Sequence, residues 1–548
     1  MSFDALPFDV LGGLIEWATV FGIFLALILL VGFAIAGLAG QRGVRIFTDT
    51  IQRAVIDSLQ SSPRRILALS TLTFREAIRR KLMPVAGLFV VLIMFAGWFL
   101  ADTSTMERPE LQAKVYVSFV LTAISWLVIP AVLLLACWGI PDDIKARSLH
   151  TVVTKPARKN EILLGRILGF SAVGTLLLAF MGVIGYIWIE REVDADLKCR
   201  VPVYGQLGFK DRMGADAEEG VNTGDIWMFR SYIEGATKSR AIWQFTDLDT
   251  GRIEDKLVFE TRFEAFRTHK GRIGEGLHAE LTFVNPATGQ EFRHPQSITI
   301  SEYREGDNLI EIDRKYTYID PESNESEQVD FVDDVIAESF TVQEEDGGES
   351  TFANGLTVVV RCMDPGQYIG MARPDLFVSL PPRSFASGFF KSLLGTWLML
   401  VLVVVLGVTA STFVKGPIAT FLTFSSIIVG LSFREFATRV VDQEVSGSGT
   451  VESAIRIWTQ VNPTTPLGEG AATGTAKLVD PIFNNGLWLV LKFIPDFRPF
   501  QLAVYPANGF DVPFATGLLP AFAVVAAFLL PCLIIGYISL SLRELETK

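Results

Sequence analysis

The segment IPDDIKARSLHTVVTKPARKNEILLGRILG, residues Ile140 to Gly169, separates two apolar runs of the chain. A helix needs about 20 apolar residues to cross the hydrocarbon core of a bilayer, and both flanking runs reach that length. Half of the 548 residues are hydrophobic, which agrees with further runs of this kind. The sequence therefore predicts an α-helical polytopic membrane bundle.

Seven runs qualify as membrane spans. They are Leu14 to Gly40, Met83 to Ala101, Val115 to Ile140, Ile167 to Ile189, Phe389 to Val414, Pro417 to Phe433 and Thr516 to Leu542. We interpret the first run as a retained anchor and not as a signal peptide. Its apolar core is longer than that of a usual signal peptide, and it lacks a basic region at its start.

Lysine and arginine residues in the short loops set the orientation, because these side chains resist transfer across the membrane. They are concentrated from Arg42 to Lys81, between the first two runs, and from Lys145 to Arg166, between the third and fourth. Both loops are predicted to be cytoplasmic. It follows that the N-terminus and residues 190–388 lie outside a plasma (bacterial inner) membrane and that the C-terminus is cytoplasmic.

In residues 190–388, apolar residues recur at every second position, a period that is typical of strands. Runs such as SITISEY and LTVVVRC alternate with turn clusters such as REGDN and QEEDGGES. Seven or more short strands at this spacing predict an inserted, extracytoplasmic all-β sandwich or jelly roll. Cys199 and Cys362 lie near its two ends, in a compartment that permits disulfides, so they are candidates for a bridge.

No pattern typical of a catalytic or metal site occurs in the sequence. None of the four histidines is paired with His or Cys at zinc-site spacing, and Gly-x-Ser-x-Gly, His-Glu-x-x-His and P-loop motifs are missing. We therefore expect no enzymatic activity, cofactor, metal or nucleic-acid partner. Ionisable groups are also missing from the central turns of five runs, so a cytoplasmic partner is a better energy source than an ion gradient.

The pattern in the segment Ile140 to Gly169 predicts a short amphipathic helix that ends at a proline. Pro141 suits a first helical position, and Asp142 and Asp143 complement the positive helix start. Pro156 ends this helix, and Asn160 can cap the next one. A partial apolar stripe comprises Ile144, Leu149, Val152 and Val153. The alternative is a positively charged loop that only sets the topology.

Upstream, the stretch RRILALSTLTFREAIRRKLMP carries Phe74 and Ile78 one helical turn apart, flanked by Arg75 and Arg79. A basic helix with one apolar face is typical of an element that lies in the membrane interface. We expect such an interfacial helix on the cytoplasmic side, before the chain turns into the second span.

These stretches resemble the type-2 ABC transporter permeases. The shared features are TFREAIRRKL before a span, an acidic pair, a short helix, a Lys-Pro-x-Arg turn and a Gly-Arg pair in the opening segment, and WLVLKFIPDFRPFQL before the last span. The resemblance covers Arg64 to Glu190 and Phe389 to Lys548. It implies an exporter subunit that pairs with itself or a homologous half and docks a separate cytoplasmic ATPase through a coupling helix at residues 142–154. The implied ATPase-coupling residues are Asp142, Asp143, Arg147, Leu149, Val152, Lys155, Pro156 and Arg158.

Two features depart from this family, namely the extra N-terminal span and the inserted β domain. The insertion point is similar, in topology only, to the permeases that extract lipopolysaccharide from a bacterial inner membrane. The expected domains are residues 1–63, an anchor span with a basic linker; 64–189, the first half of the permease core; 190–388, the β domain; and 389–548, the second half, with NGLWLVLKFIP as an outer re-entrant or interfacial helix.

A function of another class also fits the sequence. The chain could be a membrane-anchored binding or assembly protein of the cell envelope, whose outer sandwich recognises a ligand without transport. An ATPase encoded by the neighbouring reading frame would distinguish the two.

Overall fold

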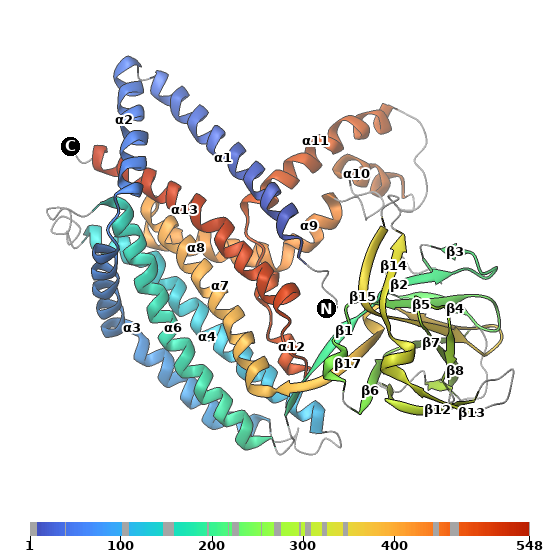
Figure 1. The fold of residues 1–548 in the computed structure, drawn as a ribbon. Helices are drawn as coiled ribbons and strands as arrows, with labels where there is room; N and C mark the ends of the chain where they lie inside the picture. Colours follow the sequence, from blue (N-terminus) through green and yellow to red (C-terminus); the bar gives the residue numbers. More distant parts are fainter. Residues whose placement is uncertain are drawn as a thin grey trace. The chain divides into compact units, whose positions relative to one another are not determined.

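The computed structural model describes residues 8–38, 40–100, 109–145, 158–193, 197–217, 219–221, 230–253, 255–267, 276–294, 297–301, 308–319, 326–343, 349–441, 449–460 and 471–546. The chain divides into a β unit and a helical unit, both drawn in Figure 1. The β unit comprises Lys198–Phe385 together with Gly509–Asp511, and the helical unit contains the chain on both sides of it. The predicted insertion of a β domain between membrane helices is thereby confirmed.

The helical unit contains five long helices before the β unit and seven helices after it among the described residues. The first group is α1 (Val10–Leu38), α2 (Gly40–Leu59), α3 (Pro63–Phe99), α4 (Pro109–Lys145) and α6 (Lys159–Glu192). The second group is α7 (Phe385–Phe413), α8 (Gly416–Ile428), α9 (Arg434–Val441), α10 (Thr450–Thr459), α11 (Ala471–Phe493), α12 (Val504–Ala507) and α13 (Leu519–Glu546).

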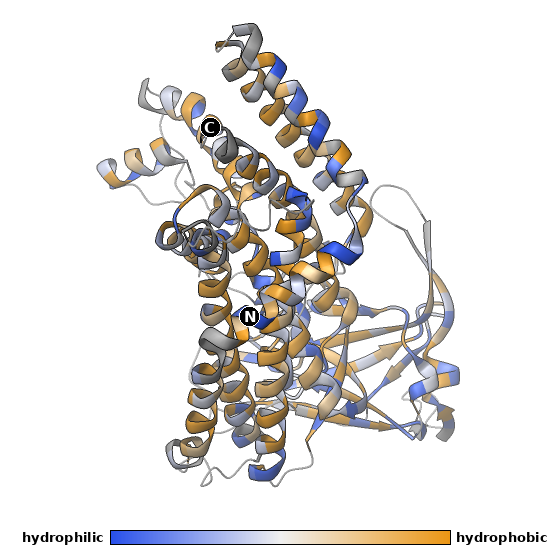
Figure 2. Ribbon diagram, turned by 90° about the vertical axis from the view of Figure 1, so that its left-hand side faces the viewer, coloured by the Kyte–Doolittle hydropathy of each residue, from blue (hydrophilic) through white to orange (hydrophobic). Residues whose placement is uncertain are grey.

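Within the described residues, 6 helices are long and apolar enough to cross a membrane, and Figure 2 shows hydrophobic residues along the bundle. They are Val10–Leu38, Gln112–Asp142, Lys159–Glu192, Phe385–Phe413, Gly416–Phe433 and Phe514–Ser541. The second predicted span falls in α3, where the apolar stretch Pro84–Ala96 is shorter than the others. The helical membrane part is therefore confirmed, whereas a count of seven spans is not.

Glycines on α6 let neighbouring helices approach closely. A Cβ atom built on Gly165 would lie 2.6 Å from the Cβ of Leu69, and one built on Gly169 would lie 2.5 Å from the Cβ of Thr73. Two glycines four residues apart share one helix face, and small residues at this spacing are typical of contacts between membrane helices. The pair forms the seam between α3 and α6, which run side by side in Figure 1.

Replacing Gly169 by leucine tests this seam. The new side chain has no space against Thr73, so Gly169→Leu is expected to lower the free energy of unfolding by about 1–3 kcal/mol. Gly87→Leu on α3 is the matched control, because no atom lies within 4 Å of a Cβ built there. Chemical denaturation in detergent measures both variants. Equal stability of the two variants would contradict a close α3 and α6 contact.

The β unit consists of short antiparallel strands. They are β1 (Lys198–Tyr204), β2 (Gln206–Lys210), β3 (Asp216–Ala217), β4 (Ser231–Glu234), β5 (Arg240–Phe245), β6 (Lys256–Thr261), β7 (Glu264–Arg267), β8 (Leu277–Val284), β9 (Glu291–Arg293), β10 (Ile298–Ile300), β11 (Asn308–Asp313), β12 (Lys315–Ile319), β13 (Ser326–Asp330), β14 (Ala337–Gln343), β15 (Glu349–Cys362), β16 (Gln367–Met371) and β17 (Leu376–Ser384). One sheet has the order β1-β17-β6-β11, and a larger one has the order β10-β8-β15-β5-β2-β3, with β14 and β9 pairing at its side. Smaller sheets join β12 with β13 and β4 with β16 and β7.

Alternation along the strands produces the core of this unit. In β8, the sequence LHAELTFV buries every second residue, so Leu277, Ala279, Leu281 and Phe283 point into the core. Aromatic rings from both large sheets meet there, with the centroids of Phe259 in β6 and Phe283 in β8 5.2 Å apart. Hydrophobic burial between two sheets therefore holds the unit together.

The β unit also contains a tripeptide that sequence analysis assigned to the second half of the core. Gly509–Asp511 pairs with β1, since Arg200 N donates to Gly509 O at 2.7 Å and Asp511 N donates to Arg200 O at 2.8 Å. The carboxylate of Asp511, which is 4% exposed, accepts a bond from Arg383 at 2.8 Å. The predicted boundary of 190–388 also shifts, because α6 continues to Glu192 and α7 begins at Phe385.

The disulfide suggested for Cys199 and Cys362 is not formed. Cys199 lies on β1 in the four-stranded sheet, whereas Cys362 ends β15 in the eight-stranded sheet. Both side chains are fully buried. Burial raises the pKa of the Cys362 thiol to about 11, which disfavours the reactive thiolate.

Alkylation without a reducing agent tests the absence of this bond. We expect iodoacetamide to label all four cysteines after denaturation, because none of them is in a disulfide. In the native protein at pH 8, Cys362 should react slowly, since a pKa of about 11 leaves about a thousandth of the thiol ionised. A peptide containing Cys199 linked to Cys362 in the mass spectrum would contradict the structure.

Candidate functional site: the facing ends of α4 and α6

The predicted coupling residues are only partly within the described structure. Asp142 and Asp143 lie in the last turn of α4, and Arg158 precedes α6. The remaining coupling residues, Arg147, Leu149, Val152, Lys155 and Pro156, fall outside the described residues. The described part of this site therefore consists of the C-terminal end of α4 and the start of α6.

Helix α4 does not break at Pro141, where the sequence predicts a new helix. It is continuous from Pro109 to Lys145 and contains Pro130 and Pro141 in its interior. A proline removes one backbone hydrogen bond but is tolerated in membrane helices, where neighbouring groups compensate. Asp142 and Asp143 thus stand near the C-terminal end of a long helix, not at the start of a short one.

Glu161 joins the starts of two helices. Its carboxylate is fully buried and accepts hydrogen bonds from Ser62 N at 2.8 Å and from Arg158 N at 3.0 Å. Ser62 and Arg158 are the N-cap residues of α3 and α6, whose first N–H groups lack partners within their own helices. Arg65 adds a charged contact, with Nη2 3.0 Å from Glu161 Oε1. One negative charge therefore serves the positive ends of α3 and α6.

The predicted cap of α6 was wrong. The helix begins at Lys159 with Arg158 as its N-cap, so Asn160 lies inside the first turn. Glu161 occupies the third helical position and reaches back to the N-cap backbone, as a capping glutamate does. An acidic residue three positions after the N-cap is a recognisable helix-start signal, and it could have identified Glu161 from the sequence.

The side chain of Arg158 extends to the C-terminal end of α2. Its Nη1 donates to Ile56 O at 3.1 Å, its Nη2 donates to Gln60 Oε1 at 2.6 Å, and its Nε lies 3.8 Å from Asp57 Oδ1. Ile56 O also accepts a backbone bond from Gln60 N at 3.0 Å. Carbonyl groups in the last turn of a helix carry partial negative charge, so a guanidinium is favourable there. The start of α6 is therefore attached to α2 as well as to α3.

Helix α13 contacts the same region through two hydrogen bonds. The hydroxyl of Tyr537 donates to Asp57 Oδ2 at 2.9 Å, and Lys159 Nζ donates to Ser541 Oγ at 3.3 Å. We call Asp57, Ser62, Arg65, Arg158 and Glu161 the Glu161 cluster. Together with Tyr537 and Lys159, it connects the ends of α2, α3, α6 and α13.

The residues of the predicted interfacial helix lie in the middle of α3. Phe74 and Ile78 are half-buried, Arg75 is exposed, and the side chain of Arg79 is outside the described part. The expected turn into the second span is not formed, because α3 runs without a break from Pro63 to Phe99 through Pro84. The residues buried beside Phe74 and Ile78 are Thr73 and Ala77, and Thr73 lies on the seam with α6.

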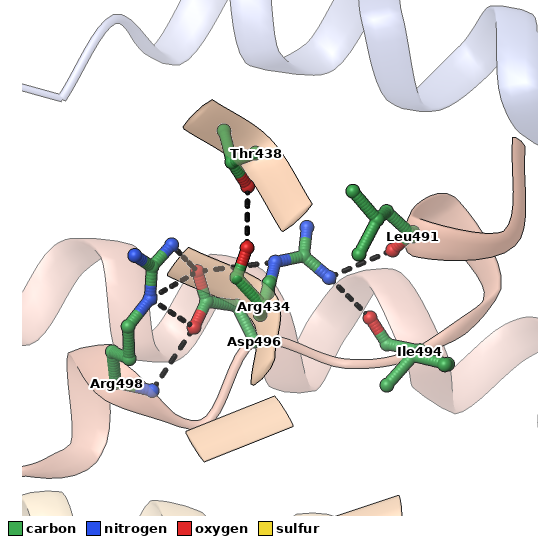
Figure 3. Close-up of polar contacts among 6 residues, drawn as sticks. All are labelled: Arg434, Thr438, Leu491, Ile494, Asp496 and Arg498. Carbon is green, nitrogen blue, oxygen red and sulfur yellow. Dashed lines mark hydrogen bonds and ion pairs between the residues drawn. The ribbon is translucent and has the colours of Figure 1, made fainter. Parts of the chain in front are cut away.

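A second polar cluster links α9 to the end of α11 (Figure 3). Arg434 donates to Leu491 O at 2.7 Å and to Ile494 O, and its Nε lies 3.3 Å from Asp496. Asp496 also pairs with Arg498 at 2.7 Å. Burial lowers the pKa of Arg434 from its ordinary value, while the Asp496 carboxylate acts in the opposite direction. These contacts fix the segment WLVLKFIPDFRPFQL, on which part of the family resemblance rests. Arg434 binds two backbone carbonyl groups and one carboxylate there, which is a structural role.

Among the described residues, no group of three or more His, Cys, Asp or Glu side chains is arranged to hold a metal ion. The sequence matches no protein-family model and no curated protein.

Neutralising Glu161 tests the role of its charge. In Glu161→Gln, an amide group replaces one acceptor oxygen and faces backbone N–H donors, so the free energy of unfolding should fall by about 2 kcal/mol. Glu192→Gln at the other end of α6 is the matched control, because Glu192 is exposed and its replacement should change stability by less than about 0.5 kcal/mol. Denaturation in detergent measures both, and an equal small effect would show that the cluster does not hold the helices.

Proposed function

We propose that this protein is the membrane permease subunit of an ABC-2 type exporter in a plasma membrane, powered by a separate cytoplasmic ATPase. In this proposal, residues 142–154 dock on the ATPase, and the chain pairs with a second copy or with a homologous permease. ATP hydrolysis takes place in the partner subunit. The N-terminus and the β unit lie outside, and the C-terminus lies in the cytoplasm.

The observation that supports the proposal best is the Glu161 cluster. Residues 142–154 begin in the last turn of α4 and end four residues before Arg158, the N-cap of α6. Arg158, shortly after this segment, bonds to α2, and Glu161 bonds the start of α6 to α3. A displacement of this segment would therefore act on several helix ends together and not on a free loop.

Close packing would carry such a displacement along α6. Gly174 and Gly182 face Leu400 and Leu393 of α7, and a Cβ atom on either glycine would lie within 2.6 Å of those side chains. Packed helices transmit movement because their interfaces lack empty volume. An ATPase that contacts the segment differently in its two nucleotide states could thereby shift the permease between two arrangements.

Acidic substitutions on the apolar stripe test the docking of the ATPase. Leu149→Asp with Val152→Asp should leave membrane insertion intact, because the segment lies outside the apolar spans. Desolvating two carboxylates in an apolar contact is unfavourable, so recovery of the ATPase with the permease should fall roughly tenfold or more. Co-purification of tagged permease with the ATPase of the same host, compared by quantitative mass spectrometry, measures this loss.

Leu309→Asp is the control for this experiment. Leu309 is 62% exposed on β11, so its replacement adds a carboxylate far along the chain from the segment. This variant should retain the ATPase. If the double variant also retains it, the segment is not the docking element. If the unaltered protein brings down no ATPase, the alternative of a binding or assembly protein gains support and the proposal fails.

A further inference from the structure

The helical unit contains an apolar cavity of about 350 Å³. Its walls come from α1, α7, α8, α13, the end of α11 and the residues that follow it. This volume lies at the lower end of the range of about 300–1,000 Å³ that is typical of small-ligand sites. Ile494, whose carbonyl accepts a bond from Arg434, is part of this wall, so the cavity adjoins the polar cluster around Arg434.

Three side chains of the cavity wall already donate hydrogen bonds to backbone carbonyls. Thr409 Oγ1 donates to Cys532 O at 3.3 Å, and Thr423 Oγ1 donates to Ala419 O at 2.9 Å. Trp17 Nε1 donates to Ala527 O at 3.0 Å, which fixes α1 to α13. A cavity with few free polar partners holds water poorly and favours an apolar occupant.

Helix α1 contributes a wall of aromatic rings. Trp17 and Phe21 are stacked with centroids 5.0 Å apart, and Phe24 lies 6.2 Å from Phe493 at the end of α11. Only 6% of the most apolar stretch of α1 is buried within the protein. Farther along, α1 packs against α2 through pairs such as Phe33 and Phe47, and an apolar chain in the cavity would add packing at the other end of α1.

Two opposite charges border this apolar space. Lys492 lines the cavity, and its ammonium group pairs with the carboxylate of Glu16 on α1. Lys492 also lies 5.4 Å from the ring centroid of Trp488. Its side chain is 24% exposed and that of Glu16 is 56% exposed, so both groups can be reached from outside. A ligand that carries one positive and one negative group could pair with both residues at once.

We propose that the cavity binds an acyl chain of a zwitterionic phospholipid from the bilayer. The lipid phosphate pairs with Lys492 and its ammonium group pairs with Glu16, so the internal ion pair is replaced by two new ones without leaving a charge unpaired. The acyl chain fills the space between the rings of α1 and the helices α7, α8 and α13. This inference does not depend on the proposed transport function.

Lipid binding to the full-length protein in mild detergent tests this proposal. Native mass spectrometry would compare phosphatidylethanolamine, phosphatidylglycerol and diacylglycerol with identical chains. Phosphatidylethanolamine should bind with one molecule per chain and roughly tenfold more tightly than the other two, because only its headgroup matches both charges. Equal binding of the three lipids by the unaltered protein would overturn the proposal, since that is the behaviour of a general lipid shell.

Charge variants separate the two headgroup contacts. Glu16→Gln should remove the preference for phosphatidylethanolamine over phosphatidylglycerol, because the partner of the ammonium group is lost. Lys492→Gln should remove the preference over diacylglycerol, because the partner of the phosphate is lost. Lys256→Gln is the matched control, since it breaks the exposed ion pair with Glu311 on the β unit and should change none of these ratios. Unchanged ratios in the first two variants would contradict the assignment.

Filling the cavity tests the acyl-chain site itself. Ala410 lines the cavity and is 4% exposed, so Ala410→Trp should abolish specific binding of every lipid. Retained binding would place the lipid elsewhere and overturn the proposal. Should this larger side chain prevent folding, the charge variants decide, because Glu16 and Lys492 are partly exposed and their replacements leave the core unchanged.

Discussion

The carboxylate of Glu161 is buried, so its charge has to be balanced by donors from the protein and not by water. Those donors are the N-cap amides of α3 and α6 and the guanidinium of Arg65. Each of these amides would otherwise be an unsatisfied group at a helix start. The same hydrogen bonds balance the buried charge of Glu161 and satisfy the amides at the starts of α3 and α6. They therefore fix where the two helices begin relative to each other.

The glycine seam depends on this common starting point. Gly165 and Gly169 follow the N-cap Arg158 by 7 and 11 residues, and they meet Leu69 and Thr73, which follow the N-cap Ser62 by the same 7 and 11 residues. If the starts of the two helices shifted, larger residues would replace the glycines in the contact and the helices would separate. Polar contacts at the end of the bundle and close packing along it are thus parts of one arrangement.

Much of the architecture could be predicted because it depends on local patterns. The apolar runs before and after the opening segment became α4 and α6, and the period of two in residues 190–388 became antiparallel strands such as β8. The helix starts were less predictable. Pro141 was expected to begin a helix and Asn160 to cap one, but α4 continues through the proline and Arg158 is the cap. Both differences arise because contacts with neighbouring helices outweigh local preference.

The sequence by itself determined the membrane helices, the inserted strands and the presence of a charged segment between α4 and α6, because hydrophobicity and periodicity act over neighbouring residues. Only the tertiary structure decided that Arg158 contacts Ile56, that Asp511 joins the β unit, and that Cys199 and Cys362 stay apart. Each of these cases concerns residues that are distant in the chain and either meet or stay apart in the folded protein. Their positions follow from how buried polar groups find partners and how side chains fill space after the helices and sheets have packed.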